Sequence, residues 1–349
     1  MKLIRTTEAV GHVLCHDVTQ IIPGQFKGPA FRKGHVIREE DIPVLLSIGK
    51  ENLYVWEKNE GMLHEDEAAA VLRDLAMGPN MSASEPSEGK IELKAECGGL
   101  LKINSEALLT INSTPQMMIA TRHGNTPVRR GDKLAGTRII PLVIEKEKMD
   151  DLTARTRAVT GGKPVLELKS WVHKKVGIVT TGSEVYKGRI EDKFTPVLCR
   201  KLEEFDTEII GHETTDDDDR MTTAAIQKLL DQGADVVLCT GGMSVDPDDR
   251  TPLAIRNTGA DIVTYGAPVL PGAMFLLSYL PALREGGPKR VVCGLPGCVM
   301  YAKRTIFDLL LPRIMADDPI RAEEIHALGE GGLCLGCSVC TYPNCGFGK

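Results

Sequence analysis

The feature that most constrains the fold of this chain is a repeated alternation of strand-like and helix-like segments between residues 174 and 315. The strand-like segments are short apolar runs at 176–180, 208–211, 236–239, 261–268 and 290–293. Segments with helical apolar spacing separate them, at 195–205, 220–232 and 299–315. Such alternation predicts an α/β domain, in which a mostly parallel sheet lies between two helical layers in a three-layer αβα fold.

Three of the predicted strands are followed at once by short loops of glycine and polar residues. These loops are 181–184 (Thr-Gly-Ser-Glu), 240–244 (Thr-Gly-Gly-Met-Ser) and 294–297 (Gly-Leu-Pro-Gly). Parallel strands end at one edge of a sheet, where open α/β sheets bind ligands, and glycine lets backbone N–H groups approach a ligand closely. The loops therefore predict a site for a phosphate-bearing organic ligand. The candidate binding residues are Thr181, Gly182, Ser183, Gly241, Gly242, Ser244, Gly294, Pro296 and Gly297.

Four aspartates at 216–219 precede the helix pattern at 220–232. Asp218 or Asp219 is predicted to cap that helix and to complement its dipole. The role of Asp216 is left undecided, because at the mouth of its loop it is also a candidate for a metal or ribose contact.

Composition excludes several classes of protein. The net charge is −6 and only 4% of residues are aromatic, so a general nucleic-acid binder is not expected. The N-terminus has no signal-peptide core, and the apolar stretch at 273–283 is too short to cross a bilayer. We therefore expect a cytoplasmic protein that is not bound to a membrane. A homo-oligomer is also expected, although the sequence does not set its size.

The rest of the chain predicts a division into further domains. Residues 1–76 have the pattern of a mixed α+β segment, and a stretch of turn-forming residues at 77–89 follows it. Residues 90–150 predict a small β-rich module, with a strand that includes Leu108, Leu109 and Ile111. The αβα domain is expected at 165–320, and a cysteine-rich tail at 330–349.

The tail contains four of the ten cysteines, in the pattern Cys334-x₂-Cys337-x₂-Cys340-x₄-Cys345. Short spacings let successive thiolates face one metal centre, and the pattern approaches the bacterial ferredoxin run with a longer last gap. Zinc would accept the same four thiolates. An iron–sulfur cluster is preferred and zinc comes next, ahead of a disordered tail with reduced cysteines. A further cysteine, Cys298, fits either a buried structural residue or a reactive thiol beside the third loop.

The α/β region resembles the molybdopterin-binding domain family of molybdenum-cofactor biosynthesis, and molybdopterin molybdotransferases of the MoeA/gephyrin type in particular. The matching segments occur in the family's order over about 170–315: 179–184, 188–192, 216–217, 240–245, Asp249 with 251–252, 271–272 and 294–297.

This resemblance implies an activity and roles for particular residues. The family binds adenylylated molybdopterin, hydrolyses the adenylate and inserts molybdate into the dithiolene. By that resemblance Gly241, Gly242 and Ser244 would hold the pterin phosphate, and Asp216 would lie at the ligand. Asp249 would hold Mg²⁺ or position the hydrolytic water, and Glu184 could share that catalytic duty. The implied partners are a pterin, molybdate or tungstate, and a molybdoenzyme client.

The chain also departs from the family's pattern. Ser183 stands where the family has an aspartate, Cys298 stands where asparagine is common, and no lysines flank the Pro-Gly at 271–272. The family's Asp-Gly-Tyr-Ala signature is absent from the N-terminal region. These departures favour a non-catalytic carrier or sensor for a molybdo- or tungstoenzyme, whereas the matched loops favour an enzyme. An electron-transfer protein built around the cysteine tail is a third possibility.

Overall fold

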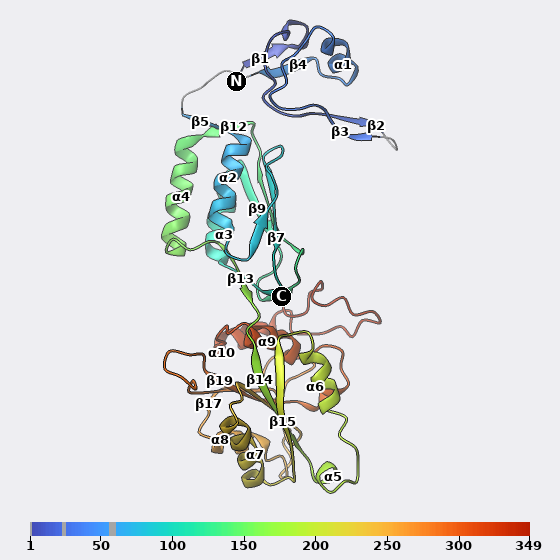
Figure 1. The fold of residues 1–349 in the computed structure, drawn as a ribbon, viewed down its shortest axis with the longest axis vertical. Helices are drawn as coiled ribbons and strands as arrows, with labels where there is room; N and C mark the ends of the chain where they lie inside the picture. The colour runs from blue at the N-terminus through green and yellow to red at the C-terminus, as the bar shows by residue number, and fades with distance from the viewer. Residues whose placement is uncertain (1, 23–25, 56–60) are drawn as a thin grey trace. The chain divides into compact units, whose positions relative to one another are not determined.

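The computed structural model describes residues 2–22, 26–55 and 61–349, and the chain forms two compact units (Figure 1). Unit 1 consists of Met1–Glu96, Ile103–Arg122 and Arg130–Glu167. Unit 2 consists of Cys97–Lys102, His123–Arg129 and Leu168–Lys349. The four-part division expected from the sequence stays a prediction.

Unit 2 is built around a six-stranded sheet in the order β15-β14-β16-β19-β18-β17. The first four strands in this order are parallel, and β18 and β17 are antiparallel additions at one side. The bounds are β14 Lys174–Thr181, β15 Thr207–Thr215, β16 Val236–Thr240, β17 Asp261–Tyr265, β18 Leu276–Leu280 and β19 Arg290–Leu295. The prediction of a mostly parallel sheet is confirmed.

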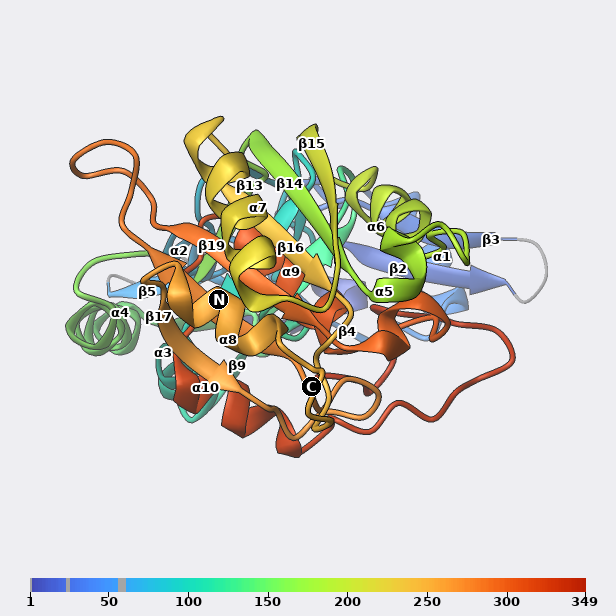
Figure 2. The same ribbon diagram turned by 90° about the horizontal axis from the view of Figure 1, so that it is seen from below.

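Helices cover both faces of this sheet (Figure 2). One face packs against apolar residues of α6 and α9, and the other packs against α7 and α8. The bounds of the helical segments are α5 Ser183–Tyr186, α6 Thr195–Leu202, α7 Asp219–Asp231, α8 Thr251–Asn257, η2 Gly297–Met300, α9 Ile306–Met315, α10 Ala322–His326 and η3 Ala327–Gly329. Unit 2 is therefore a three-layer αβα domain, as the sequence predicted.

The single helix expected at 299–315 is wrong. The chain forms the short η2, continues without helix, and begins α9 only at Ile306. The reason is a capping box, in which the Thr305 side chain accepts from the Phe307 amide and Asp308 accepts from the Thr305 amide. The strand β18 was not predicted, because the apolar stretch that contains it was considered only for whether it could cross a bilayer.

Unit 1 contains a four-stranded antiparallel sheet in the order β6-β7-β11-β9, with α2 packed against β7 and β11. The bounds in this region are β5 Met62–His64, α2 Glu65–Ala76, β6 Met81–Ala83, β7 Lys90–Ala95, α3 Ser105–Asn112, β9 Met117–Thr121, β11 Lys133–Ile139, β12 Val143–Glu145 and α4 Lys146–Thr160. The segment before it contains β1 Lys2–Arg5, η1 Thr6–Glu8, β2 Val18–Ile22, β3 Phe26–Phe31, α1 Asp41–Ser47 and β4 Asn52–Val55. Three further strands complete the assignment: β8 Gly99–Ile103, β10 Thr126–Val128 and β13 Leu166–Ser170.

The strand expected at Leu108, Leu109 and Ile111 is also wrong, because these residues lie in α3. The Asn104 side chain accepts from the Ala107 amide and so starts a helix there. The long helix α4 was not predicted, although Gly161 ends it in the left-handed conformation that favours glycine.

The cysteine-rich tail is folded against α9 in unit 2. Leu270 N donates to Gly332 O (2.8 Å) and Cys334 N donates to Leu270 O (2.8 Å), so the tail pairs with the connection between β17 and β18. Phe347 is 5% exposed within the core, and the Tyr342 hydroxyl donates to Asp308 O (2.9 Å). These contacts hold the tail in a defined place on the domain.

In the part of the chain that the structure describes, no helix combines the length and the apolar character needed to cross a bilayer.

Candidate functional site

The three glycine-containing loops lie at one edge of the unit 2 sheet. Thr180 pairs with Thr240, and Thr240 pairs with Leu295, across three adjacent parallel strands. The strands therefore end in line, and Gly182, Gly242 and Gly297 follow at the same edge.

The glycines of the second loop let that loop pack against the first one. Gly241 has a φ of 84°, and a Cβ at this position would overlap the carbonyl oxygen of Thr181. Gly242 has a φ of 54°, and its Cβ would lie 2.9 Å from Thr251 Oγ1. Thr251 closes the arrangement by donating its hydroxyl to Gly241 O (2.8 Å). The sequence predicted that glycine at these two positions would let the backbone approach a ligand. In the structure, glycine is needed there because a Cβ would collide with the neighbouring residues Thr181 and Thr251.

A cleft of about 530 Å³, which we term the edge cleft, opens where β14 and β16 end. Its lining residues come from the strand ends, from α5, from the segment before α6 and from η2: Thr180, Thr181, Val185, Ile190, Glu191, Asp192, Lys193, Phe194, Thr240, Gly241 and Met300. Thr181 and Gly241 are the two expected binding residues among them. The other candidates are not in this lining: Gly182, Ser183, Asp216, Gly242, Ser244, Gly294, Pro296 and Gly297.

One buried hydroxyl in the edge cleft lacks a partner. Thr240 is 0% exposed, lines the cleft, and its Oγ1 makes no hydrogen bond with the residues that the structure describes. A buried polar group without a partner is costly, and such a group in a site commonly bonds to a ligand or to water. The hydrogen-bonding capacity of Thr240 Oγ1 is therefore unused by the residues that the structure describes.

A hydrogen-bonded group that was not predicted from the sequence forms part of the cleft wall, because Thr180 and Asp192 both line the cleft. Thr180 Oγ1 donates to Asp192 Oδ2 (3.0 Å) and lies 3.0 Å from His212 Nε2. The Thr195 hydroxyl also donates to Asp192 Oδ2, at 2.6 Å. Asp192 belongs to a matched family segment, but His212 comes from β15, and no sequence signal connected the two.

The Asp192 carboxyl keeps its charge in this group. Burial opposes ionisation, but hydrogen bonds from the Thr195 side chain and from the amides of Thr195 and Phe194 hold the pKa of Asp192 below its usual value. The group therefore fixes a negative charge at one wall of the edge cleft.

The acidic loop that contains Asp249 is closed by its own hydrogen bonds. Asp246 N donates to Asp249 Oδ2 (2.9 Å) and Asp249 N donates to Asp246 O (2.9 Å). Glu184 lies in α5, the short helix that follows β14. Among the described residues no group of three close ligand atoms includes either carboxylate. Mg²⁺ typically uses one or two carboxylates together with substrate phosphates, so Asp249 and Glu184 fit this metal only with a phosphorylated ligand.

Asp216, the residue left open by the sequence, forms an ion pair with Lys187 (3.1 Å). The bond from the Asp217 amide and the contact with Lys187 lower the pKa of Asp216. Asp217 Oδ2 accepts from Ser183 N (2.9 Å), so this amide of the first loop already has a partner. Asp218 caps α7 by accepting from Met221 N (2.8 Å), which confirms the capping prediction.

The third loop begins later than the sequence suggested. Gly294 lies inside β19, and a Cβ there would lie 2.5 Å from Met243 Cε. Gly297 starts the four-residue η2. Cys298 is partly buried, and burial raises the pKa of its thiol, which favours the structural interpretation over the reactive one.

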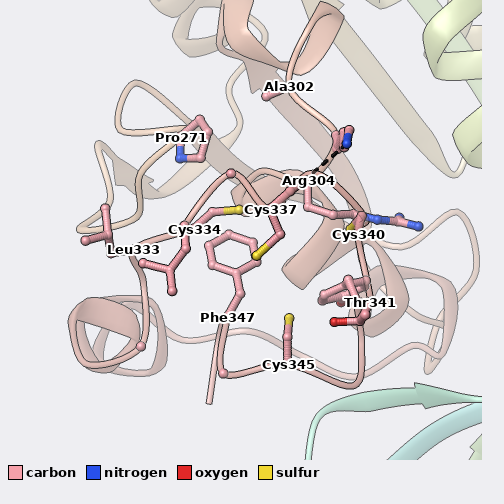
Figure 3. Close-up of a pocket in the computed structure, with 16 residues that line it drawn as sticks. Pro271, Ala302, Arg304, Leu333, Cys334, Cys337, Cys340, Thr341, Cys345 and Phe347 are labelled. Carbon is pink, nitrogen blue, oxygen red and sulfur yellow. Dashed lines mark hydrogen bonds between the residues drawn. The ribbon is translucent and has the colours of Figure 1, made fainter.

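The four tail cysteines border a second cavity in unit 2, of about 440 Å³, which we term the cysteine cavity (Figure 3). Cys334 and Cys345 are partly buried, and Cys337 and Cys340 are exposed. Two basic residues line the same cavity: Lys303 donates to Ser338 O (2.7 Å), and the Arg304 guanidinium lies 4.9 Å from the centre of the Tyr342 ring.

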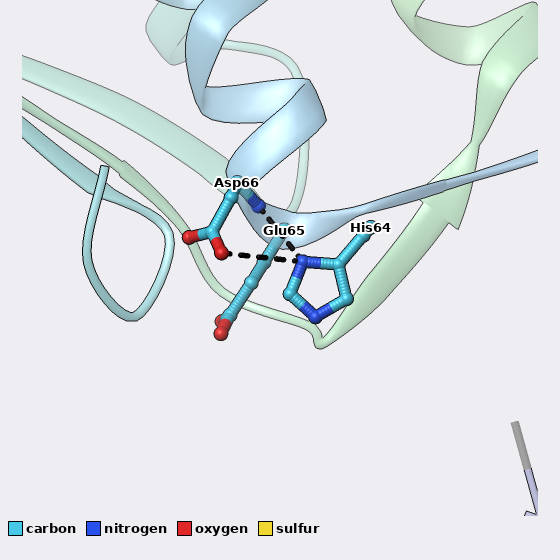
Figure 4. A group of neighbouring side chains, drawn as sticks. All are labelled: His64, Glu65 and Asp66. Carbon is cyan, nitrogen blue, oxygen red and sulfur yellow. Dashed lines mark hydrogen bonds and ion pairs between the residues drawn. The ribbon is translucent and has the colours of Figure 1, made fainter. Parts of the chain in front are cut away.

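A different group of possible metal ligands lies in unit 1, at the start of α2, and consists of His64, Glu65 and Asp66 (Figure 4). His64 Nδ1 accepts from the Asp66 amide (3.2 Å) as the helix cap, and the Lys33 ammonium lies 2.9 Å from the same nitrogen. Burial raises the pKa of Glu65 to about 7. A helix cap that already bonds to an ammonium group accounts for this cluster without a metal.

Two family models match separate parts of the chain. Residues 177–316 match a family model described as a probable molybdopterin binding domain. Residues 3–57 match a model described as a domain of unknown function, DUF8806.

Two kinds of curated relative are similar to parts of the chain. A molybdopterin molybdenumtransferase of Synechococcus elongatus is 25% identical over 184 residues, covering 50% of this chain and 44% of that protein. A CinA-like protein of Mycobacterium avium is 32% identical over 93 residues, covering 26% of this chain and 21% of that protein. The chain thus spans less than half the length of these relatives.

Solved structures of two proteins align with less than half of the chain. The molybdopterin biosynthesis enzyme MoaB from Thermus thermophilus is 20% identical, with 42% of this chain and 98% of that chain covered and a TM-score of 0.33. The tungsten cofactor synthesizing protein MoaB from Pyrococcus furiosus is 21% identical, with 42% and 94% covered and a TM-score of 0.34.

Proposed function

We propose that this protein, whose residues 177–316 match the model of a probable molybdopterin binding domain, binds a molybdopterin-type pterin at the edge cleft. The single observation that carries the proposal is the Thr240 hydroxyl, which is buried, lacks a partner among the described residues and lines this cleft. Thr181 and Gly241 also line the cleft, with the Thr181 hydroxyl donating to Thr240 O (3.0 Å). Lys193 also lines the cleft, next in the sequence to Glu191 and Asp192, so a phosphate would meet one cation as well as two carboxylates.

The finer proposal is a molybdotransferase-like reaction, in which adenylylated molybdopterin is hydrolysed and molybdate or tungstate enters the dithiolene. Asp249 and Glu184 would hold Mg²⁺, which would neutralise phosphate charge during release of AMP. Asp216, Gly242, Ser244 and the other loop candidates would contact parts of the ligand that extend beyond the cleft.

A carrier or sensor without turnover is the alternative, and particular residues favour it. Ser183 supplies no carboxylate, its amide is already bonded to Asp217, and Asp249 is engaged with its own loop. In this version the protein would deliver the pterin to a molybdoenzyme client. A homo-oligomer is part of both versions.

The tail adds a metal centre to the proposal. Cys334, Cys337, Cys340 and Cys345 would bind an iron–sulfur cluster or zinc, because all four border one cavity. Thiolates remain available to metal in a reducing compartment, so the proposal places the protein in the cytoplasm.

The test is a titration of the purified full chain with molybdopterin and with its adenylylated form. Thr240→Val removes the unpartnered hydroxyl at nearly constant shape, and we expect about tenfold weaker binding with no loss of stability. The matched control is Thr156→Val, because Thr156 Oγ1 is also buried without a partner among the described residues but lies in α4 of unit 1. Unchanged affinity in Thr240→Val would contradict the proposed position of the ligand.

A second measurement separates the enzyme from the carrier. The enzyme predicts Mg²⁺-dependent release of AMP that Asp249→Asn reduces by at least tenfold. Tight binding of the adenylylated pterin without AMP release, with Asp249→Asn behaving as wild type, would establish the carrier and exclude turnover.

A further inference from the structure

We propose that the four tail cysteines hold an iron–sulfur cluster rather than a single zinc ion, and that this cluster supports the pterin cleft through the segment that joins β19 to α9. The coupling to the cleft rests on the proposed function, whereas the identity of the metal centre does not.

The cysteine sulfurs are not gathered as closely as a single zinc ion requires. A zinc ion with four thiolates at about 2.3 Å brings the sulfurs to within about 4 Å of one another. Among the described residues, no three cysteine sulfurs all lie within 4.8 Å of one another, although all four cysteines border one cavity. The cavity of about 440 Å³ offers room for a group larger than one ion. Figure 3 shows the cysteine side chains spread around this space.

The charges around the cavity also suit a thiolate-bound cluster. Four thiolates and a cluster core leave a net negative charge, which needs nearby cations in a partly apolar cavity. Lys303 and Arg304 supply two positive charges in the lining. The Arg304 guanidinium lies 4.9 Å from the centre of the Tyr342 ring, and Lys303 donates to Cys337 O (3.3 Å) and Ser338 O (2.7 Å).

One short segment connects this cavity with the edge cleft. Met300 lines the edge cleft, while Ala302, Lys303 and Arg304 line the cysteine cavity. Between them the chain is fixed by a bond from Ala302 N to Cys298 O (2.8 Å). Only two residues separate Met300 from Lys303, so we expect a shift of Lys303 on assembly of the cluster to move Met300 as well.

The proposed coupling between the cluster and the pterin can be measured as a change in binding affinity. If the cluster fixes the segment in the position that the pterin requires, each ligand strengthens binding of the other by the same factor. We expect the cluster-loaded protein to bind the pterin about tenfold more tightly than the metal-free protein, which lies within the usual range of such couplings.

The identity of the centre is tested by anaerobic reconstitution of the full chain, with ferrous iron and sulfide in one sample and zinc in another. We expect visible thiolate-to-iron absorption and about four iron ions per chain, the content of a [4Fe–4S] cluster. Cys337→Ser and Cys345→Ser should each lose this absorption, while Cys199→Ser, outside the tail, should keep it. A chain that takes up one zinc ion and no cluster overturns the assignment, provided that circular dichroism shows it folded.

The coupling is tested by titrating molybdopterin into the cluster-loaded, metal-free and Cys337→Ser proteins. Tighter binding to the cluster-loaded form supports the coupling, and equal affinity in all three overturns it. Absence of pterin binding in every form overturns the coupling together with the proposed function, but the absorption spectrum still decides the identity of the metal centre.

Discussion

The edge cleft and the cysteine cavity lie in the same unit but are assembled in opposite ways. The lining of the edge cleft begins at Thr180 and ends at Met300, so it draws on residues 120 positions apart. Most of the cysteine cavity comes from the consecutive stretch 331–347, completed by Pro271 and by 302–304. The first site exists only when the whole sheet is formed, whereas the second has its reactive groups together in the sequence.

This difference indicates which substitutions should disrupt each site. A site made by sheet register is sensitive to any change that prevents two loops from meeting. A site made by a short tail depends on what anchors the tail, because its four thiols lie within twelve consecutive residues. Substitutions at the anchors and at the loop contacts can therefore test the comparison.

The largest effect is expected for Gly241→Ala. The new Cβ would overlap Thr181 O, and the φ of 84° disfavours any residue with a Cβ, so the free energy of unfolding should fall by about 4 kcal/mol. Urea unfolding followed by circular dichroism measures this change. The matched control is Gly297→Ala, because a Cβ there would meet nothing within 4 Å. Normal stability with lost pterin binding would mean that Gly241 serves the ligand and not the loop contact.

The next largest effect is expected for Phe347→Ala in the tail. Phe347 is 5% exposed and packs in the same core as α9, so its loss should cost about 3 kcal/mol. Leu335→Ala is the control from the same tail, because Leu335 is 82% exposed. If both variants are as stable as the wild type, the tail is not anchored through Phe347. The proposed dependence of the cysteine cavity on this anchor would then be wrong.

The smallest effect is expected for Asp192→Asn, and it depends on pH. The folded state lowers the pKa of Asp192, so the ionised carboxylate stabilises the fold above the unfolded pKa of about 4. We expect a loss of about 1–2 kcal/mol at pH 7 that shrinks as the pH falls through the lowered pKa. Thermal unfolding of both proteins at pH 7 and pH 3 measures the difference, and the exposed Asp248→Asn serves as control. A difference that grows in acid would contradict the assigned sign.

The sequence predicted the sheet edge well because the relevant signals are local. Apolar runs end in glycine at β14 and β16, and Asp218 precedes a helix pattern, so strand ends and a cap could be placed without tertiary information. His212 could not be associated with Asp192, because its strand reaches the cleft only through pairing with β14. The break before α9 was missed although Thr305 and Asp308 carry its signal, because the apolar pattern continues on both sides of them.

The pairing of Leu270 with Leu333 shows that the packed domain extends beyond the residues that match the family model. The match ends at residue 316, whereas backbone bonds at Leu270 and the core position of Phe347 extend the packed unit well beyond it. A fragment cut at the family boundary would leave two backbone groups of Leu270 without their partners and a void beside α9. We expect such a fragment to aggregate more readily than the full chain, because apolar surface beside α9 would be exposed. A fragment prepared for comparison with shorter relatives should therefore keep the last thirty residues or so.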